Sequence, residues 1–426
     1  MFRTLKNAWN IEDIRKKMIF TFMMVVVFRL GNSLPLPFIN PQIVQSIFHG
    51  SEGSILQMLN LITGGGLENL SVFALGVGPY ITASIVVQLL TFAIPALEEL
   101  SKEGEEGKKK IQKITKFVGL ALAILQAYAV VGGIFSSAIL TGNFPGTTLI
   151  LITVLVAGAM FIVWIGDLIG EKGIGNGLSM IIFIGIISRI PDQMIGWIQG
   201  MLAGQLQIWK FILLLLIVLL TIVFVVLLTS GERKIPVQYA KRVVGRKMYG
   251  GQSTNIPIKV NMAGVLPVIF ASSLMALPQT LGLLFGGGFQ TFVTNYLSPT
   301  GVFGSIVSII IQVGLIILFA YFYNSIQFNP IEYSKNLQQY GGFIPGIRPG
   351  RPTSDYLAKI TNRVTMIGAL GLAILAVIPT IVAGALGIRI TLAGTSVIIA
   401  VGVILETIKQ IEAMMQMRHY KGFLNK

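Results

Sequence analysis

Long apolar segments alternate with polar connections along this chain. A membrane helix needs about 20 mostly apolar residues, because each residue adds about 1.5 Å and the hydrocarbon layer is about 30 Å thick. The pattern predicts an all-α polytopic membrane protein with ten transmembrane helices, at residues 18–37, 72–94, 117–139, 148–169, 178–198, 211–229, 262–284, 304–325, 364–386 and 392–408.

The ten predicted helices divide into two groups of five. With an odd number in each half, the second half enters the membrane from the opposite side, so the halves are expected to form an inverted repeat. The boundary falls in the connection near 190–209, which gives an N-terminal half at 1–200 and a C-terminal half at 201–426. This division depends on counting helices, because the halves show no residue-level similarity.

Glycine and proline interrupt the second predicted helix of each half. Interrupted helices at corresponding positions indicate where a membrane protein keeps the pathway of the molecule that it transports. Glycine and proline are, however, also frequent in ordinary membrane helices. The pattern therefore fits either a pathway or simple kinks. The residues are Gly76, Gly78, Pro79 and Pro95 in the first half and Gly264, Pro267 and Pro278 in the second.

A short apolar run precedes the second predicted helix. Residues 54–70 hold about eight apolar-patterned positions and then three consecutive glycines, which is too short to cross a membrane. Non-helical backbone is tolerated at membrane depth only inside protein or beside a water-filled cavity. We therefore expect a re-entrant segment, and the glycines would allow it to move.

The distribution of basic residues orients the chain. All but four of the 32 lysines and arginines lie at the two ends or in alternate connections; the others are Arg29, Arg189, Lys210 and Arg389. An excess of basic residues marks the cytosolic side. Both termini and the long connections at 231–261 and 326–363 are therefore predicted to be cytosolic. The net charge of +15 also fits attraction to anionic lipid or nucleic acid.

Composition and motifs exclude several classes of protein. Of the 426 residues, 54% are hydrophobic and 12% charged, against about 25% charged in soluble domains. Cysteine is absent, so no thiolate chemistry is expected. The glycine-rich run 173–177 lacks the lysine and serine or threonine of a nucleotide-binding loop, and zinc and hydrolase motifs are missing. We expect no enzyme activity, cofactor or metal.

The predicted helices carry almost no ionisable residues. Arg29 and Asp167 are expected near helix ends, and His49 and His419 in loops. Ion-coupled transporters place such groups inside their helices, which argues against that class. Isoleucines spaced by four residues recur on the second and fifth helices. They suit core packing, but at a pore they would gate by excluding water.

The two long connections combine basic residues with turn formers. The run Phe-Ile-Pro-Gly-Ile-Arg-Pro-Gly-Arg-Pro occupies 343–352. Connections of this length in a compact bundle are usually functional. Arginines on fixed turns suit phosphates or acidic protein surfaces, although the charge could serve topology alone.

These features resemble the SecY family, the channel-forming subunits of the Sec protein translocase. The resemblance covers the whole chain and is carried by LGVGPYITASI at 75–85, GIGNG at 173–177, NMAGVLPVIFASS at 261–273, and FNP at 328–330 followed by PGIRPG at 345–350. It implies two inverted five-helix halves around a central hourglass pore, with a re-entrant plug helix. It also implies a channel that translocates unfolded secretory polypeptides and releases membrane segments laterally.

The resemblance also implies roles for particular residues. An apolar pore ring is expected from Ile81, Ile85, Ile182, Ile186, Ile269 and Ile399. A plug is expected from Ile55, Leu56, Met58, Leu59, Leu61, Ile62, Gly64, Gly65 and Gly66. The lateral gate is expected to include Thr82, Ser84, Gln88, Ser272 and Ser273, and partner contacts Arg242, Arg246, Lys247, Arg348 and Arg351. One departure is Ala393, where the family commonly has glycine.

The implied partners supply the energy that the chain itself lacks. The family works with the SecA motor ATPase or with the ribosome, whose RNA the cytosolic loops contact, and small SecE and SecG subunits brace the channel. Signal peptides and unfolded secretory proteins pass through it. The implied location is the bacterial cytoplasmic membrane, with several crossings and both termini cytosolic. A secondary transporter and a membrane-embedded enzyme are the competing classes.

Overall fold

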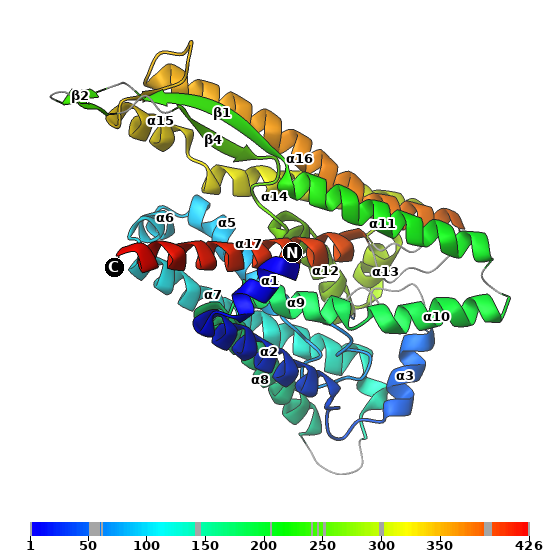
Figure 1. Ribbon diagram of the computed structural model, residues 1–426. Helices are drawn as coiled ribbons and strands as arrows, with labels where there is room; N and C mark the ends of the chain where they lie inside the picture. The colour runs from blue at the N-terminus through cyan, green and yellow to red at the C-terminus, as the bar shows by residue number, and fades with distance from the viewer. Residues whose placement is uncertain are drawn as a thin grey trace.

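The computed structural model is predominantly helical, with a small β unit at one end (Figure 1). It describes residues 2–50, 60, 63–140, 146–204, 207–239, 242–244, 247–249, 253–297, 302–386 and 394–424. In Figure 1 most helices of the first half lie in the lower part of the view, and the strands and several helices of the second half lie in the upper part.

The described elements of the first half are helices. Its elements are α1 (Phe2–Trp9), α2 (Glu12–Ser33), α3 (Pro41–Gly50), α5 (Gly78–Ala93), α6 (Pro95–Lys102), α7 (Glu105–Tyr128), η1 (Ala129–Ile134), η2 (Ser136–Ala138), α8 (Thr147–Lys172), α9 (Gly177–Ile187) and α10 (Ile190–Leu202). Here η1 is a π-helical continuation of α7.

The described part of the second half adds two small antiparallel sheets to its helices. Its elements are α11 (Ile208–Ser230), β1 (Glu232–Tyr239), β2 (Arg242–Val244), β3 (Lys247–Tyr249), β4 (Ser253–Lys259), α12 (Leu266–Phe285), α13 (Gly287–Tyr296), α14 (Val302–Gln327), α15 (Pro330–Gln339), β5 (Gly342–Phe343), α16 (Arg351–Leu386) and α17 (Gly394–Leu424).

Each of the ten predicted transmembrane segments overlaps a helix. The helices are α2, α5, α7, α8, α9, α11, α12, α14, α16 and α17. By length and composition, six helical stretches of the described residues are able to cross a membrane, or seven if α5 and α6 count as one span bent by 101°. The exact number of crossings therefore stays a prediction, and so does the division at residue 200.

Two predicted helices differ from the observed ones. The second was expected from residue 72 but begins at Gly78, because the chain turns through 71–77 and Pro79 then occupies the first helical turn. The fifth was expected as one helix but breaks between α9 and α10. Pro191 lies in the first turn of α10, where its missing N–H costs nothing.

The two long connections, which the sequence predicted to be cytosolic, pack together through strands and an apolar cluster. β1 pairs antiparallel with β4, so that Ile235 faces Ile256, and β5 pairs with the other edge of β1. Alternate residues of β1 are buried. They join an apolar cluster of Ile235, Val237, Ile258, Phe328, Leu337, Ile344 and Leu357, which comes from both connections.

The largest apolar core is shared between the halves. It contains Phe28 of α2 and Ile162 of α8 as well as Phe319 of α14 and Leu372 of α16. A second cluster, which includes Leu151 and Leu155 of α8, lies within the first half. Neither half therefore completes its main core alone.

Candidate functional site

The six isoleucines predicted for the pore ring lie in the core shared by the two halves. α5 carries Ile81 and Ile85, α9 carries Ile182 and Ile186, α12 carries Ile269 and α17 carries Ile399. All six belong to one contiguous apolar cluster and are between 1% and 7% exposed. Along this series α5 packs on α12, α12 on α17 and α17 on α9.

In the described part of the chain, the centre formed by these isoleucines contains no buried charged side chain. Among the described residues, no Asp, Glu, Lys or Arg is buried. A closed contact of apolar side chains excludes water and ions without any ion-binding group. The arrangement can therefore act as a seal, whereas it offers no chemistry for ion coupling or catalysis.

The residues predicted for the lateral gate lie on two helices that pack together. Thr82, Ser84 and Gln88 are on α5, and Ser272 and Ser273 are on α12, which contacts α5. Thr82, Ser272 and Ser273 are buried. The Ser272 hydroxyl has no hydrogen-bond partner among the described residues, which leaves a buried polar group uncompensated there.

A tyrosine that the sequence reasoning missed joins the gate helices. The Tyr323 hydroxyl of α14 donates to Gln88 Oε1 at 2.6 Å, and Gln88 Nε2 donates to Ser84 Oγ at 3.1 Å. The Tyr323 ring packs edge-on against Phe270 of α12, with centroids 5.2 Å apart. One side chain thus contacts both helices expected to form the gate. Its 235-residue separation from Gln88 leaves no local sequence signal.

Replacing Tyr323 with phenylalanine is expected to favour the open gate, because it removes the hydroxyl and keeps the ring on Phe270. One net hydrogen bond contributes about 0.5–1.5 kcal/mol, which corresponds to a closed-to-open ratio about two- to tenfold lower. The measurement is the fraction of a marginally apolar test segment released into lipid, which should rise. Tyr321→Phe is the matched control, because the Tyr321 hydroxyl bonds the Asn362 carbonyl of α16 instead. An equal rise in both variants contradicts the prediction.

Only part of the predicted plug falls within the described residues. Gly64, Gly65 and Gly66 are buried, whereas Ile55, Leu56, Met58, Leu59, Leu61 and Ile62 lie outside the described residues. Gly64 and Gly65 have φ values of +68° and +93°, which favour glycine. The Gly64 carbonyl accepts a hydrogen bond from Asn32 Nδ2 of α2 at 2.8 Å. The glycine run therefore forms a turn that is hydrogen-bonded to α2.

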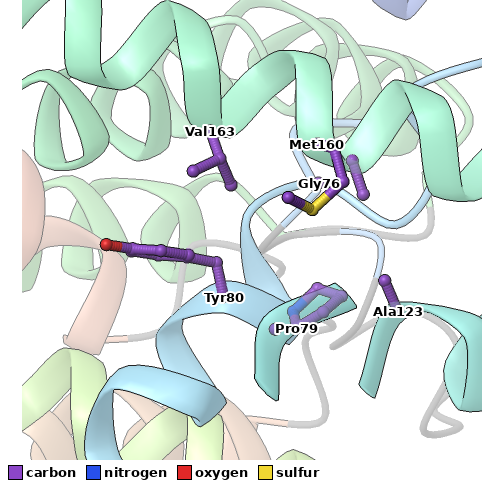
Figure 2. A pocket seen from close by; sticks show the side chains of 8 residues that line it. Gly76, Pro79, Tyr80, Ala123, Met160 and Val163 are labelled. Carbon is purple, nitrogen blue, oxygen red and sulfur yellow. The ribbon is translucent and has the colours of Figure 1, made fainter. Parts of the chain in front are cut away.

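A small apolar hollow lies beside the start of α5 (Figure 2). Figure 2 shows Met160 and Val163 of α8 opposite Pro79 and Tyr80 of α5. Its empty volume is 180 Å³, and Gly76, Gly119, Ala123 and Ala159 complete its lining. This lining carries no charged side chain. The hollow offers no site for a nucleotide or metal ion.

The arginines predicted to contact partners lie on the β unit and its turns. Arg348 and Arg351 are exposed, and neither takes part in an ion pair among the described residues. Arg246 lies outside the described residues. Arg242 and Lys247 are described only by their backbone, in β2 and β3.

The turn that carries Arg348 is held by hydrogen bonds. Ser334 Oγ of α15 donates to the Gly350 carbonyl at 2.6 Å, and Thr353 Oγ1 donates to the Arg348 carbonyl at 2.8 Å. Gly346 and Gly350 have φ values of +83° and +98°. The guanidinium is therefore presented to solvent from a fixed backbone, which lowers the entropy cost of binding.

Known proteins match the chain along its whole length. The SecY family model matches residues 71–408. The protein named "Protein translocase subunit SecY" of Mycobacterium tuberculosis (strain ATCC 25618 / H37Rv) is 44% identical over 448 residues, covering 100% of both chains. The protein of the same name from Thermotoga maritima is 41% identical over 440 residues, covering 100% of this chain and 98% of its own.

Solved structures share the fold at low sequence identity. One described as "The structure of a protein conducting channel" has a TM-score of 0.68 at 19% identity and covers 94% of this chain and 92% of its own. One described as "Sec61 in the Canine ribosome-channel complex from the endoplasmic reticulum" has a TM-score of 0.62 at 17% identity, with the same coverage. The predicted fold class is confirmed, and the protein is a membrane protein. The chain belongs to the SecY family.

Proposed function

We propose that this protein is the channel through which unfolded polypeptides cross the membrane, and that the isoleucine ring is its constriction. The observation that carries the proposal is the buried apolar cluster, to which α5, α9, α12 and α17 each contribute predicted ring residues. The protein is a non-enzymatic subunit of the protein translocase, so its residues must seal and guide a passenger rather than transform it.

An apolar ring suits a passenger of arbitrary sequence. An unfolded polypeptide presents every kind of side chain, so specific polar ligands in the wall would retain some segments and exclude others. Isoleucine side chains deform around varied groups and still limit the passage of ions by excluding water. The ring therefore supports passage without selection by sequence.

Lateral release needs a seam that opens toward lipid. The proposed seam runs between α5 and α12, where Thr82, Ser272 and Ser273 are buried and Tyr323 bridges to Gln88. An apolar passenger segment gains about 0.3–0.6 kcal/mol for each Leu, Ile, Phe or Val that reaches the membrane centre. A segment with enough such residues outweighs the weak polar contacts that close the seam.

The segment that ends at Leu70 is proposed as the plug. A solved structure with a TM-score of 0.66 and 19% identity is described as "The plug domain of the SecY protein stablizes the closed state of the translocation channel and maintains a membrane seal". The same role here is supported by the glycine turn at 64–66 and its hydrogen bond to Asn32.

Energy is proposed to come from partners on the cytosolic β unit. Arg348 and Arg351 would contact the SecA motor, and the basic turn of β2 and β3 would contact SecA or ribosomal RNA. The canine Sec61 channel, which shares the fold, is described in a ribosome complex. SecE and SecG are proposed to cover apolar faces such as that of α11, which is largely exposed.

The proposed location is the bacterial cytoplasmic membrane with both termini cytosolic. The C-terminus and β2 lie at the same end of the molecule in Figure 1, and basic residues lie in or beside both segments. The end of α10 and the start of α11 lie at the opposite end, and residues 203–209 hold no lysine or arginine. The curated relatives come from bacteria.

Disulfide crosslinking tests the proposed pathway. Because the chain has no native cysteine, single cysteines can replace Ile85, Ile269 and, as a lipid-facing control on α2, the exposed Phe22. A secretory precursor that carries one cysteine is arrested in transit with SecA and ATP. Crosslinks should form at Ile85 and Ile269 and not at Phe22. If the cysteine at Phe22 crosslinks equally well, or if no crosslink forms at any position, the pore assignment is wrong and the transporter hypothesis is favoured.

A further inference from the structure

An ion pair connects the segment before α5 to the break between α9 and α10. Arg189 Nη1 lies 2.6 Å from Glu68 Oε2, although the two residues are 121 positions apart in sequence. Arg189 is one of the few basic residues outside the predicted cytosolic connections. The proposed function gives neither residue a role.

Asn60 fixes the Glu68 carboxylate in place. Asn60 Nδ2 donates to Glu68 Oε2 at 3.0 Å, and the Glu68 backbone N–H donates to Asn60 Oδ1 at 3.0 Å. The Gly65 N–H donates to the Asn60 carbonyl at 2.9 Å. These hydrogen bonds join residues 60, 65 and 68 into one turn. They also orient the Glu68 carboxylate toward Arg189.

The glycines of this turn allow the arginine and α9 to come close. A Cβ on Gly65 would lie 2.4–2.8 Å from atoms of the Arg189 guanidinium, and a Cβ on Gly64 would lie 2.6 Å from the Gly185 Cα. Side chains at these two positions would push the turn away from α9. The glycine run therefore serves contact with α9 as well as the sharp backbone turn.

The pair is placed where its charge interaction is only partly screened. The side chains of Arg189 and Glu68 are 25% and 39% exposed, so solvent reaches them less than it reaches a surface pair. Within the described part of the chain, Arg189 forms its ion pair with Glu68. Asp192, three residues further along, is exposed on α10.

Arg189 is also close in sequence to the proposed ring. Ile186 lies three residues before it at the end of α9, and Gly185, which contacts Gly64, precedes Ile186. Widening of the ring by movement of α9 would therefore pull directly on the turn at 60–68. Opening of the ring and release of this turn would therefore both move the backbone at Gly185 and Ile186.

We infer that Glu68 and Arg189 form an electrostatic latch that holds the turn at 60–68 against α9 and sets how easily the channel opens. Arg189 is then a positioning residue that acts through this segment. The inference rests on the proposed plug function. It adds that the plug is secured by a specific charge pair whose arginine lies two residues beyond α9, the helix that carries Ile182 and Ile186.

Ion leak through channels without a passenger tests the latch. Glu68→Gln and Arg189→Gln should each raise the leak of reconstituted proteoliposomes about three- to tenfold, as expected for a charge-assisted pair discounted for its partial exposure. The double variant should leak no more than either single one. Glu68→Arg combined with Arg189→Glu should lower the leak again, and Arg189→Lys should restore part of the closure. Asp192→Asn is the charge control and should leave the leak unchanged.

A deletion separates this inference from the plug proposal. In a variant that lacks residues 60–66, leak should exceed that of every single substitution. If the deletion leaks but Glu68→Gln and Arg189→Gln match the unmodified channel, the latch is wrong and the plug role stands. If the deletion does not leak, the plug role itself fails. If the charge-swapped variant leaks as much as the single ones, the ion pair is not what holds the turn.

Discussion

Replacing Ile85 with asparagine should leave this channel permeable to ions even without a passenger. Ile85 is only 1% exposed and lies in the apolar cluster that holds all six proposed ring residues. An amide there would be buried without an assured partner, at a cost of about 1–3 kcal/mol. Water that enters the ring can hydrogen-bond the amide, so the substitution lowers the free energy of the hydrated ring relative to that of the dry ring. The leak should rise on the order of tenfold or more.

The measurement is the rate of ion flux from proteoliposomes, compared at equal amounts of channel. Ile85→Leu conserves volume and polarity and should keep the seal. Ile162→Asn places the same amide in the same cluster, but on α8, which carries none of the proposed ring residues. If Ile162→Asn leaks as much as Ile85→Asn, general loosening of the core explains the result and the ring assignment is wrong.

Reversing the charge of Arg348 should stop motor-driven translocation while the channel stays closed and intact. The turn around Arg348 is fixed by hydrogen bonds from Ser334 and Thr353, so a glutamate would occupy the same exposed position. Like charges brought together at an interface cost several kcal/mol, and we expect translocation to fall about tenfold or more. The assay is SecA- and ATP-dependent import of a secretory precursor into vesicles, with ion leak measured in parallel.

Lys335→Glu provides the matched control for charge. Lys335 is exposed on α15 of the same β unit, but it lies outside the Arg348 turn. The prediction requires that Arg348→Glu lose translocation, that Lys335→Glu keep most of it, and that neither variant leak. Normal translocation by Arg348→Glu would show that the motor docks elsewhere.

The sequence predicted the helices well because hydrophobic length is a strong signal in lipid. It missed details that depend on backbone geometry. Residues 72–77 are as apolar as a helix, yet Gly76 has a φ of +57° and the chain turns there before α5 begins. The β unit gave only a weak signal, because Ile235 and Val237 have the spacing of a half-buried strand but Pro236 lies between them.

The site was predictable where a motif carried it and hidden where distant residues meet. The ring and gate positions came from the resemblance at 75–85 and 261–273, since four-residue spacing alone suits ordinary core packing. Tyr323 with Gln88, and Arg189 with Glu68, are joined only by the fold. No local pattern encodes a contact between residues more than a hundred positions apart.

The core shared between the halves also sets the order in which the protein matures during its own synthesis. Ile398, Ile399 and Val403 belong to this core, and α17, which carries them, leaves the ribosome after the other described helices. Until α17 inserts, the earlier helices can hide their apolar faces in lipid but cannot complete the centre. The centre of the newly made protein therefore becomes watertight only once α17 has inserted, and a chain interrupted before α17 would lack this seal.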